Sequence, residues 1–502
     1  MFGWISDRKM KNEAKAYSQM IDKIREEVRN ENGDSKTGKA YKRLFEAAQF
    51  NRLTSSWTAI SYSPNQELYN DLAILKIRSR DLFSNSPVIN NFVTLLQNNV
   101  VGDKGFQFRS LVKDKEIATK IQDEWNNYCK KGNLEASGKY GINNLLDLAI
   151  ISLAIDGEII VRKYPRMGKY NFQIELLHSE QLILTQHKEY FMGIQSDEFG
   201  KPISYCITDK HPSEGFIKYQ FIPANQILHS FIPYQVGASR GVPMIFSVMP
   251  TIKRLEDYRK AEAIAANIQA SKYVTYTQTQ PDDLDAEMAI ASMMLPGTKR
   301  QTIEPGMAEI LPPGVDAKYV QSTHPTTQFP DFCKSLQKEV SAGLGISYNS
   351  LYSDFENTSF SSMRAAFVTE KAFYKKIQNI IVETLLTPLF ESWLDCACAS
   401  GVLNLPPVMG NYDYYKNHDF IGKAIVFSNP LQEINAAVIA INNRTMSKTQ
   451  FCLDQGFTYE EVCRDIKNEQ DIEKSTGINF EIVPKNSVIA PVPDGVGTTP
   501  IA

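Results

Sequence analysis

The chain has 502 residues, of which 43% are hydrophobic and 22% are charged, and its net charge is −3. This composition describes a soluble globular protein, and the length exceeds one ordinary core, so we expect two to four structural units. The charge excludes the strongly basic balance of a protein that holds nucleic acid tightly, because each neutralised phosphate adds affinity through counterion release.

No amino-terminal segment combines basic residues, an apolar core and a cleavage site, so we expect no signal peptide. The longest apolar run, residues 145–155, is too short for a bilayer, which needs about 20 apolar residues. The seven cysteines are scattered and odd in number, which favours reduced thiols in a cytoplasm.

The amino-terminal part of the chain is predicted to be helical. Residues 1–60 are charged and have helical periodicity with one flexible break. The first strongly periodic block covers residues 66–100, and it is interrupted where Ser86 can cap a second helix that has Pro87 at its first position. The stretch VVGDKGFQFRSLV (100–112) is expected to turn into a strand, and another helix is expected over residues 114–130.

The next part, up to residue 243, favours an α+β domain built on an antiparallel or mixed sheet. Residues 142–155 predict a buried helix, and Asp156–Gly157 turns the chain into the strand EIIVRKY. Residues 171–232 contain five short β-type runs punctuated by turn residues. These runs are FQIELL, QLILTQ, YFMGIQ, ISYCITD and YQFIP.

Two long helices, 244–272 and 328–344, flank an insert of residues 273–327 that contains Pro, Gly and short strand patterns. Pro250 should bend the first helix or mark its true first turn. The polar, aromatic segment 345–362 has no alternating pattern, and long loops without secondary structure tend to be functional or disordered.

A helix over residues 361–399 then runs past Pro388. Residues 401–430 are predicted to be irregular, and two or three helices follow. The composition of residues 481–502, rich in Pro, Gly, Val and Thr, predicts a disordered tail.

Catalytic motifs are weak throughout. Residues 33–40 nearly spell a phosphate-binding P-loop, but a charged helix precedes them and Ala40 replaces the hydroxyl that would hold magnesium. Cys396 and Cys398 are two apart on a predicted helix, about 200° around its axis, so they cannot face one metal ion. No G-x-S-x-G sequence offers a nucleophile.

The six histidines show no HExxH or H-x-H spacing, and we expect His178 and His229 at strand ends with a local hydrogen bond. Asp354 and Glu356 form a carboxylate pair for which a metal or general-acid role is conceivable, with solvated loop charges as the default. We therefore predict no enzyme activity, no cofactor and no metal site.

Four stretches in order resemble the portal proteins of lambda-type tailed bacteriophages. They are LKIRSRDLFSNSP…LLQNNVVG (75–102), LHSFIPYQVGASRGVPMI (228–245), SAGLGISYNSLYSDFENTSFSSMRAAF (341–367) and FSNPLQEINAAVIAINNRTMSKTQFCLDQGFTYEEV (427–462). Two positions depart from the family pattern: Asn429 replaces an Asp before Pro, and Asn443 replaces a glycine. Both changes are mild, because Asn shares the capping ability of Asp and the tolerance of Gly for left-handed backbone.

The resemblance implies an α+β portal fold with named parts. These are a charged amino-terminal segment (1–60), a wing (61–243), a first stem helix (244–272), a clip insert (273–327), a second stem helix (328–344), a tunnel loop (345–362), a wing-crossing helix with an irregular segment (361–427), crown helices (428–480) and a tail (481–502). It also implies a dodecameric ring at one capsid vertex, in the virion and, during assembly, in the host cytoplasm.

The partners implied by the resemblance are double-stranded DNA bound without regard to sequence, the terminase large subunit, a head–tail connector or adaptor, and a major capsid or scaffold protein, with no membrane. Such a ring nucleates capsid assembly, docks terminase through the clip, and retains or releases the genome. Hydrolysis of ATP belongs to terminase, in agreement with the failed P-loop.

On this basis, two groups of side chains are candidates for the DNA channel. On the tunnel loop they are Tyr348, Asn349, Tyr352, Asp354, Phe355, Glu356, Asn357 and Ser359. On the first stem helix they are Lys253, Arg254, Lys260 and Lys272. The acidic pair would repel phosphate. The alternatives are a solvated helix face for the cations and packing of Tyr352 and Phe355 against their own helix.

Two other classes of protein remain as rivals. One is another ring protein of the virion, such as a head–tail adaptor, although adaptors are usually much smaller. The other is a phage-encoded hydrolase that works from the β-rich region 150–240, which lacks a nucleophile or metal constellation.

Overall fold

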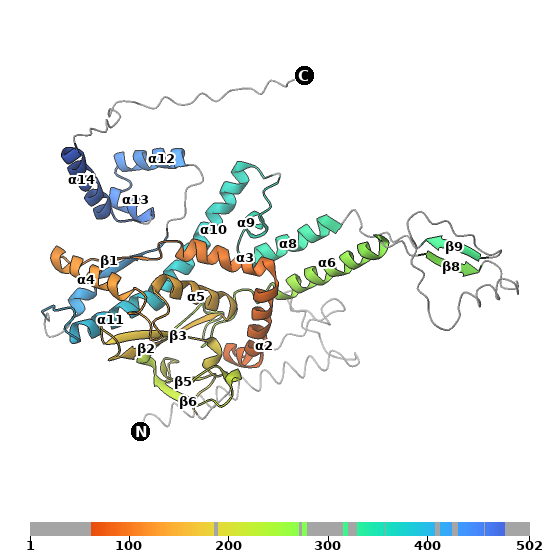
Figure 1. Cartoon of the computed structure of the whole chain (residues 1–502), viewed down its shortest axis with the longest axis horizontal. Helices are drawn as coiled ribbons and strands as arrows, with labels where there is room; N and C mark the ends of the chain where they lie inside the picture. The colour runs from red at the N-terminus through yellow and green to blue at the C-terminus, as the bar shows by residue number, and fades with distance from the viewer. Residues whose placement is uncertain are drawn as a thin grey trace, which may run out of the picture. The chain divides into compact units, whose positions relative to one another are not determined.

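A computed structural model of the chain describes residues 62–184, 189–270, 274–278, 315–319, 329–356, 358–406, 412–423, 430–455 and 457–476. Several predictions fall outside this part: those for residues 1–60, most of the clip insert, the tail 481–502, Lys272, Asn357 and Asn429. Figure 1 shows the arrangement of the helices and strands.

The helices α2 (Pro64–Asn85) and α3 (Pro87–Leu96) are separated by one residue, Ser86. Ser86 is extended, with φ −101° and ψ 115°, and Pro87 follows in the first turn of α3. The interruption therefore falls where the sequence predicts it. A π-helical turn, Gln97–Val101, extends α3 and ends at Gly102, which has a φ of +71°.

Two three-stranded antiparallel sheets confirm the α+β class. The first has the order β3-β2-β7 and the second has the order β4-β5-β6. Their strands are β2 (Glu158–Pro165), β3 (Phe172–Leu177), β4 (Ile194–Ser196), β5 (Pro202–Thr208), β6 (Tyr219–Pro223) and β7 (Ile227–Phe231). The helices α4 (Lys115–Tyr128) and α5 (Ile142–Ile155) complete this region. Short 3₁₀ turns cover Ser179–Gln181, Pro212–Glu214, Ala224–Gln226 and Asp413–Lys416.

The described part of the run QLILTQ, residues 181–184, is not the predicted strand, because its first residue, Gln181, ends the 3₁₀ turn Ser179–Gln181. His178 and Gln181 form a capping box around this turn, and such local side-chain bonds compete with strand pairing. The prediction for His229 is also wrong, since it lies inside β7 rather than at a strand end. His178 does make the expected local hydrogen bond, from the backbone N of Glu180.

Residues far apart in the sequence form a further pair of strands, β1 (Gln107–Ser110) and β10 (His418–Ile421). Phe108 lies opposite Phe420 in this pair, and their ring centroids are 5.4 Å apart. Trp125 packs against both of these rings, and Phe390 packs against Phe108 and Trp125. The prediction of an irregular segment over 401–430 is therefore wrong for residues 418–421.

A helical stretch from residue 360 to residue 399 confirms the predicted passage through Pro388. It consists of α10 (Phe360–Ile381), a π-helical turn (Val382–Leu386) and α11 (Thr387–Ala399). Proline has no N–H to donate to the carbonyl four residues earlier, and the π-helical turn contains that residue, Thr384. This helical stretch buries Tyr374, Leu385 and Trp393 in the main core, to which α3, α4 and α5 also contribute.

The helices α6 (Met249–Ala270) and α8 (Phe329–Leu344) pack side by side (Figure 1). Leu255 of α6 shares an apolar cluster with Cys333 and Leu336 of α8. At Gly343 the approach is close, because a Cβ atom there would lie 2.4 Å from Val248 Cγ1. The first helix starts at Met249 rather than at residue 244, so Pro250 belongs to its first turn, as one of the two predictions for it states.

The strands β8 (Val274–Gln278) and β9 (Val315–Tyr319) follow α6 and precede α8, and they pair in antiparallel register from Val274↔Tyr319 to Gln278↔Val315. Three helices end the described chain: α12 (Pro430–Asn442), α13 (Lys448–Asp454) and α14 (Tyr459–Thr476). None of the helices in the described residues is long and apolar enough to span a bilayer.

A buried ionic cluster joins α2 to the first sheet. Glu158 has no exposed side-chain surface, and it accepts hydrogen bonds from Lys76 Nζ at 2.6 Å, Arg240 Nε at 2.7 Å and His229 Nε2 at 3.0 Å. Burial alone would raise the pKa of Glu158, but the charges of Arg240 and Lys76 outweigh it and hold this pKa well below 4.5. Arg240 Nη1 also donates to Met192 O at 2.7 Å, which ties the second sheet region to the cluster.

His229 gives this cluster a pH dependence. Burial lowers the pKa of His229 below 6.5, so the folded ring stays neutral while an unfolded chain takes up a proton. Stability is therefore expected to fall as the pH drops below 6.5, by at most about 1.4 kcal/mol per pH unit.

The matched variant is His229→Gln, whose side-chain amide can still donate to Glu158 but does not titrate. Thermal unfolding midpoints measured between about pH 7.5 and about pH 5.5 should fall more in the wild type than in the variant. Equal slopes in the two proteins would contradict the assignment.

Candidate functional site

The loop after α8 contains a helical turn, which corrects the expectation of a segment without secondary structure. Gly345 has a φ of +71° and ends α8, and Ile346 then returns to the core with 3% of its surface exposed. The side chain of Ser347 accepts a hydrogen bond from Ser350 N and so caps α9 (Tyr348–Tyr352). Such a serine cap satisfies one free N–H at the start of a helix. The left-handed Ser353, with a φ of 54°, ends α9.

Two side chains of the same chain hold the carboxylate of Asp354. It accepts a hydrogen bond from the hydroxyl of Tyr348 at 2.7 Å and from Lys334 Nζ, on α8, at 3.1 Å. These bonds lower the pKa of Asp354, while burial and the bond to Asp354 raise the pKa of Tyr348 to about 12. The charge of Asp354 is thus offset by Lys334, whereas Glu356 is exposed.

The aromatic side chains of the loop divide into a packed set and an exposed one. The rings of Tyr348 and Tyr352 are stacked with centroids 5.4 Å apart, and Lys334 Nζ lies 5.3 Å from the centroid of Tyr348. Tyr352 also packs against the main core, in keeping with the packing alternative. Phe355 has 56% of its surface exposed, so it does not pack in this way.

The loop is anchored on both sides. Ser347 N donates to Glu370 Oε1 of α10 at 2.9 Å. Asn91 of α3 donates to Leu351 O at 2.8 Å. Within the loop, Asn349 donates to Thr358 Oγ1 at 2.9 Å, and Ser359 caps α10 through a bond from Ser362 N. These hydrogen bonds hold the backbone on both sides of Phe355 and Glu356, whose side chains are exposed.

The anchoring residues Lys334, Glu370 and Asn91 were missed by the sequence analysis. Lys334 lies 20 positions before Asp354 and Asn91 lies 260 positions before Leu351. For the Lys334–Asp354 contact, the one available signal in the sequence is the order of a helix, a glycine and an aromatic loop.

The described candidate cations of α6, which are Lys253, Arg254 and Lys260, are exposed and project from the helix in two directions. Lys253 and Lys260 are seven residues apart, so they project within about 20° of each other around the helix axis. Asp257 lies between them and binds Lys253 at 3.0 Å. Glu256 also lies beside this face, about 60° around the axis from Lys253 and about 40° from Lys260, so two lysines are matched by two carboxylates. Arg254 projects about 100° away.

The relatives of this chain are portal proteins. It is 30% identical over 463 residues to the probable portal protein of Halomonas phage phiHAP-1, a match that covers 87% of this chain and 88% of the relative. It is 20% identical over 475 residues to portal protein B of Escherichia phage lambda, covering 84% and 88%. These similarities define the class as phage portal proteins.

The family within that class follows from a second comparison. Residues 50–378 match the phage portal proteins of the lambda family. Because the match spans more than half of the sequence, this chain belongs to the lambda family of phage portal proteins.

Among solved structures, the chain is similar to a chain in the neck of a native gene transfer agent particle computed with C12 symmetry. The TM-score is 0.42 at 12% identity, over 76% of this chain and 93% of that chain. For the neck of the empty particle, computed with C6 symmetry, the TM-score is 0.43, over 81% and 98%.

Proposed function

We propose that this protein forms a dodecameric ring at one vertex of the capsid and that double-stranded DNA passes through the ring during packaging and ejection. In this proposal the ring has no enzymatic activity, and the terminase motor supplies the energy. Membership in the lambda portal family supports the proposal. The observation that carries it is the pairing of α6 with α8 next to a loop fixed to α8 by the Lys334–Asp354 bond.

Repetition of the paired helices around an axis would give the walls of a channel. One lysine in each subunit then becomes a girdle of lysines around the channel, so a few such side chains suffice to contact phosphates. Contacts of this kind go to the DNA backbone and carry no sequence information. The carboxylates beside these lysines suit sliding, because more neutralised phosphates would hold the duplex more tightly.

The loop between α8 and α10 would touch the DNA through its exposed side chains. Phe355, Glu356 and Ser359 are the exposed members among the described loop candidates, and Ser359 is already used as the cap of α10. Asp354 is already paired with Lys334, so it contributes less repulsion to phosphate than its sequence suggests. We therefore assign the repulsive role to Glu356 and the contact role to Phe355.

The remaining partners follow from the proposed ring. The insert between α6 and α8 would dock the terminase large subunit and later the head–tail connector. The helices α12 to α14 would face the capsid interior, near the major capsid or scaffold protein. The protein would be part of the virion and would pass through the host cytoplasm during assembly.

The experiment that tests the ring is the mass of the purified protein combined with negative-stain imaging. The expected result is an annular particle with a central opening and a mass many times the 56.7 kDa of the chain. A compact monomer without an opening would overturn the proposal. A ring of few subunits would favour the alternative class, another ring protein of the virion such as a head–tail adaptor.

A deletion tests the docking role of the insert. The register of β8 and β9 ends at the pair Gln278↔Val315, so an Asn-Gly turn can replace residues 279–314 and close the hairpin. We expect the ring to assemble and binding of the terminase large subunit, measured by biolayer interferometry, to fall at least about tenfold.

The matched control for this deletion is a chain without residues 477–502, which should bind terminase as the wild type does. Unchanged binding by the hairpin-closed variant would contradict the docking assignment. Loss of the ring in that variant would instead assign the insert to assembly.

A further inference from the structure

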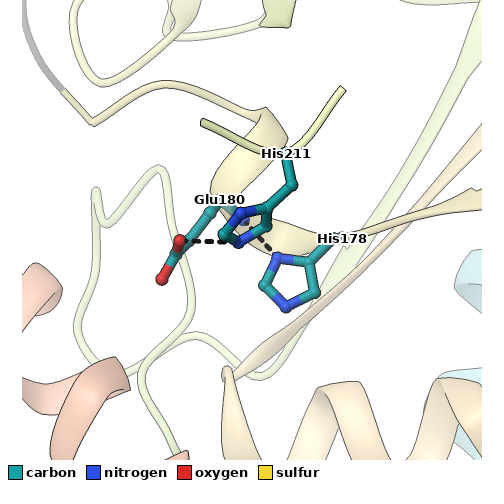
Figure 2. A group of neighbouring side chains, drawn as sticks. All are labelled: His178, Glu180 and His211. Atoms are coloured by element: carbon teal, nitrogen blue, oxygen red, sulfur yellow. Dashed lines mark hydrogen bonds and ion pairs between the residues drawn. The ribbon is translucent and has the colours of Figure 1, made fainter. Parts of the chain in front are cut away.

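Two histidines and a glutamate meet where the two sheets of the β-rich region approach each other. His178 precedes the 3₁₀ turn Ser179–Gln181, which follows β3 of the first sheet, and His211 precedes the turn Pro212–Glu214, between β5 and β6 of the second. Figure 2 shows the two imidazoles with Glu180 beside them. One ligand atom from each of the three residues lies within 4.8 Å of the other two.

The ring nitrogens can offer lone pairs toward one point. His211 Nε2 lies 2.9 Å from Glu180 Oε2, and the two imidazole centroids are 4.7 Å apart at an angle of 72°. His178 Nδ1 accepts only a long hydrogen bond, 3.3 Å, from the backbone N of Glu180 (Figure 2). A metal ion bound to N or O atoms at about 2.0–2.1 Å needs ligand atoms about 3.3 Å apart, so small side-chain rotations would complete the site.

Neighbouring residues orient the ligands. His211 Nδ1 accepts a hydrogen bond from Ser213 N at 3.2 Å, so the proton of the neutral ring lies on Nε2 and is donated to Glu180 Oε2. A metal ion at Nε2 would move this proton to Nδ1, where Ser213 Oγ, 2.7 Å away, can accept it in place of the bond from Ser213 N. Such a bond from the second ring nitrogen fixes the tautomer of metal-binding histidines. Arg80 binds Glu180 through Oε1, which leaves Oε2 directed at His211.

The local charge also favours a cation. Arg80 Nε donates to Asp156 Oδ1 at 2.8 Å, so the guanidinium is shared between Asp156 and Glu180. With both histidines neutral, Arg80, Asp156 and Glu180 carry one net negative charge.

We propose that His178, Glu180 and His211 bind a divalent transition-metal ion of the Zn²⁺ type, with water in the fourth position. Two imidazoles and one carboxylate form a ligand set that suits Zn²⁺. The ion clamps the turn after β3 to the turn between β5 and β6, beside the bond from Gln181 Nε2 to Thr208 O at 3.3 Å. This proposed site differs from the sequence-based prediction of no metal site, which rested on spacing along the chain.

The test uses untagged, full-length protein stripped with a chelator and carrying Cys463→Ser, because the exposed Cys463 thiol can bind Zn²⁺ by itself. Calorimetric titration with Zn²⁺ should give one site per chain. His211→Gln and Glu180→Gln should each weaken binding at least about tenfold. The matched control is Glu214→Gln, which removes the same charge at an exposed position nearby and should leave the affinity unchanged.

A second readout keeps the proposal decidable if a variant fails to fold. Bound Co²⁺ should give the visible absorption of a low-symmetry nitrogen and oxygen site, without the thiolate charge-transfer bands of a cysteine ligand. The proposal is overturned if the Cys463→Ser protein, with all three ligands intact, does not give this spectrum. It is also overturned if His211→Gln binds Zn²⁺ as tightly as the Cys463→Ser protein does.

Discussion

Replacing Glu158 with glutamine is expected to destabilise the protein by about 3–5 kcal/mol, because it removes the only anion in contact with two buried cations among the described residues. Lys76 has 1% of its side chain exposed and Arg240 has none. A buried charge without a partner costs several kcal/mol, and the amide keeps the shape of the side chain but not its charge. Chemical unfolding, followed by tryptophan fluorescence, measures the loss.

Two further variants sharpen this test. Asp123→Asn removes a carboxylate from an exposed position of α4 and should change the stability by less than about 0.5 kcal/mol. Lys76→Met combined with Glu158→Gln removes one of the stranded cations and should recover part of the loss. If Glu158→Gln matched Asp123→Asn, the cluster would contribute nothing to stability.

Two aspartates introduced separately into the same loop are expected to act on different properties, the stability of the fold and the filling of heads with DNA. Ile346→Asp places a carboxylate in the main core, where Ile346 has 3% of its surface exposed, and should cost about 4 kcal/mol or more. Phe355→Asp changes an exposed side chain and should leave the ring intact. It adds one negative charge per subunit beside the proposed DNA path, so DNA-filled heads should decrease severalfold.

The measurements are the yield of assembled ring and a count of filled and empty heads by electron microscopy. Phe355→Ser is the control, because it removes the ring without adding charge. Normal filling with Phe355→Asp would remove the loop from the DNA path, and a normal yield of Ile346→Asp would contradict its burial. Leu344 is buried as well, with 4% of its surface exposed, so an aspartate there is also expected to impair folding.

Helix breaks and helix ends that depend on neighbouring residues were predicted correctly from the sequence. Ser86 and Pro87 mark the break between α2 and α3, and the predicted helix does pass Pro388. The sequence also located the loop that follows α8, and its two glycines are close to the observed end of that helix. Each of these features depends on backbone preferences within a few residues.

Features that join distant residues were not predictable in the same way. The pairing of β1 with β10 connects Phe108 to Phe420, and neither four-residue strand has a pattern that names its partner. Glu158 reads as the first residue of an ordinary strand, although its partners come from positions 76, 229 and 240. The candidate metal ligands His178 and His211 meet only because two sheets bring their turns together.

The pairing of β1 with β10 has a consequence for synthesis of the chain. Phe108 leaves the ribosome more than three hundred residues before Phe420, its partner in the sheet. Until that partner emerges, Trp125 and its apolar neighbours lack part of their cover, and exposed apolar surface of this kind favours aggregation. Shortening the time between synthesis of these two strands, for example by supplying the two parts of the chain together, is therefore expected to raise the yield of folded protein.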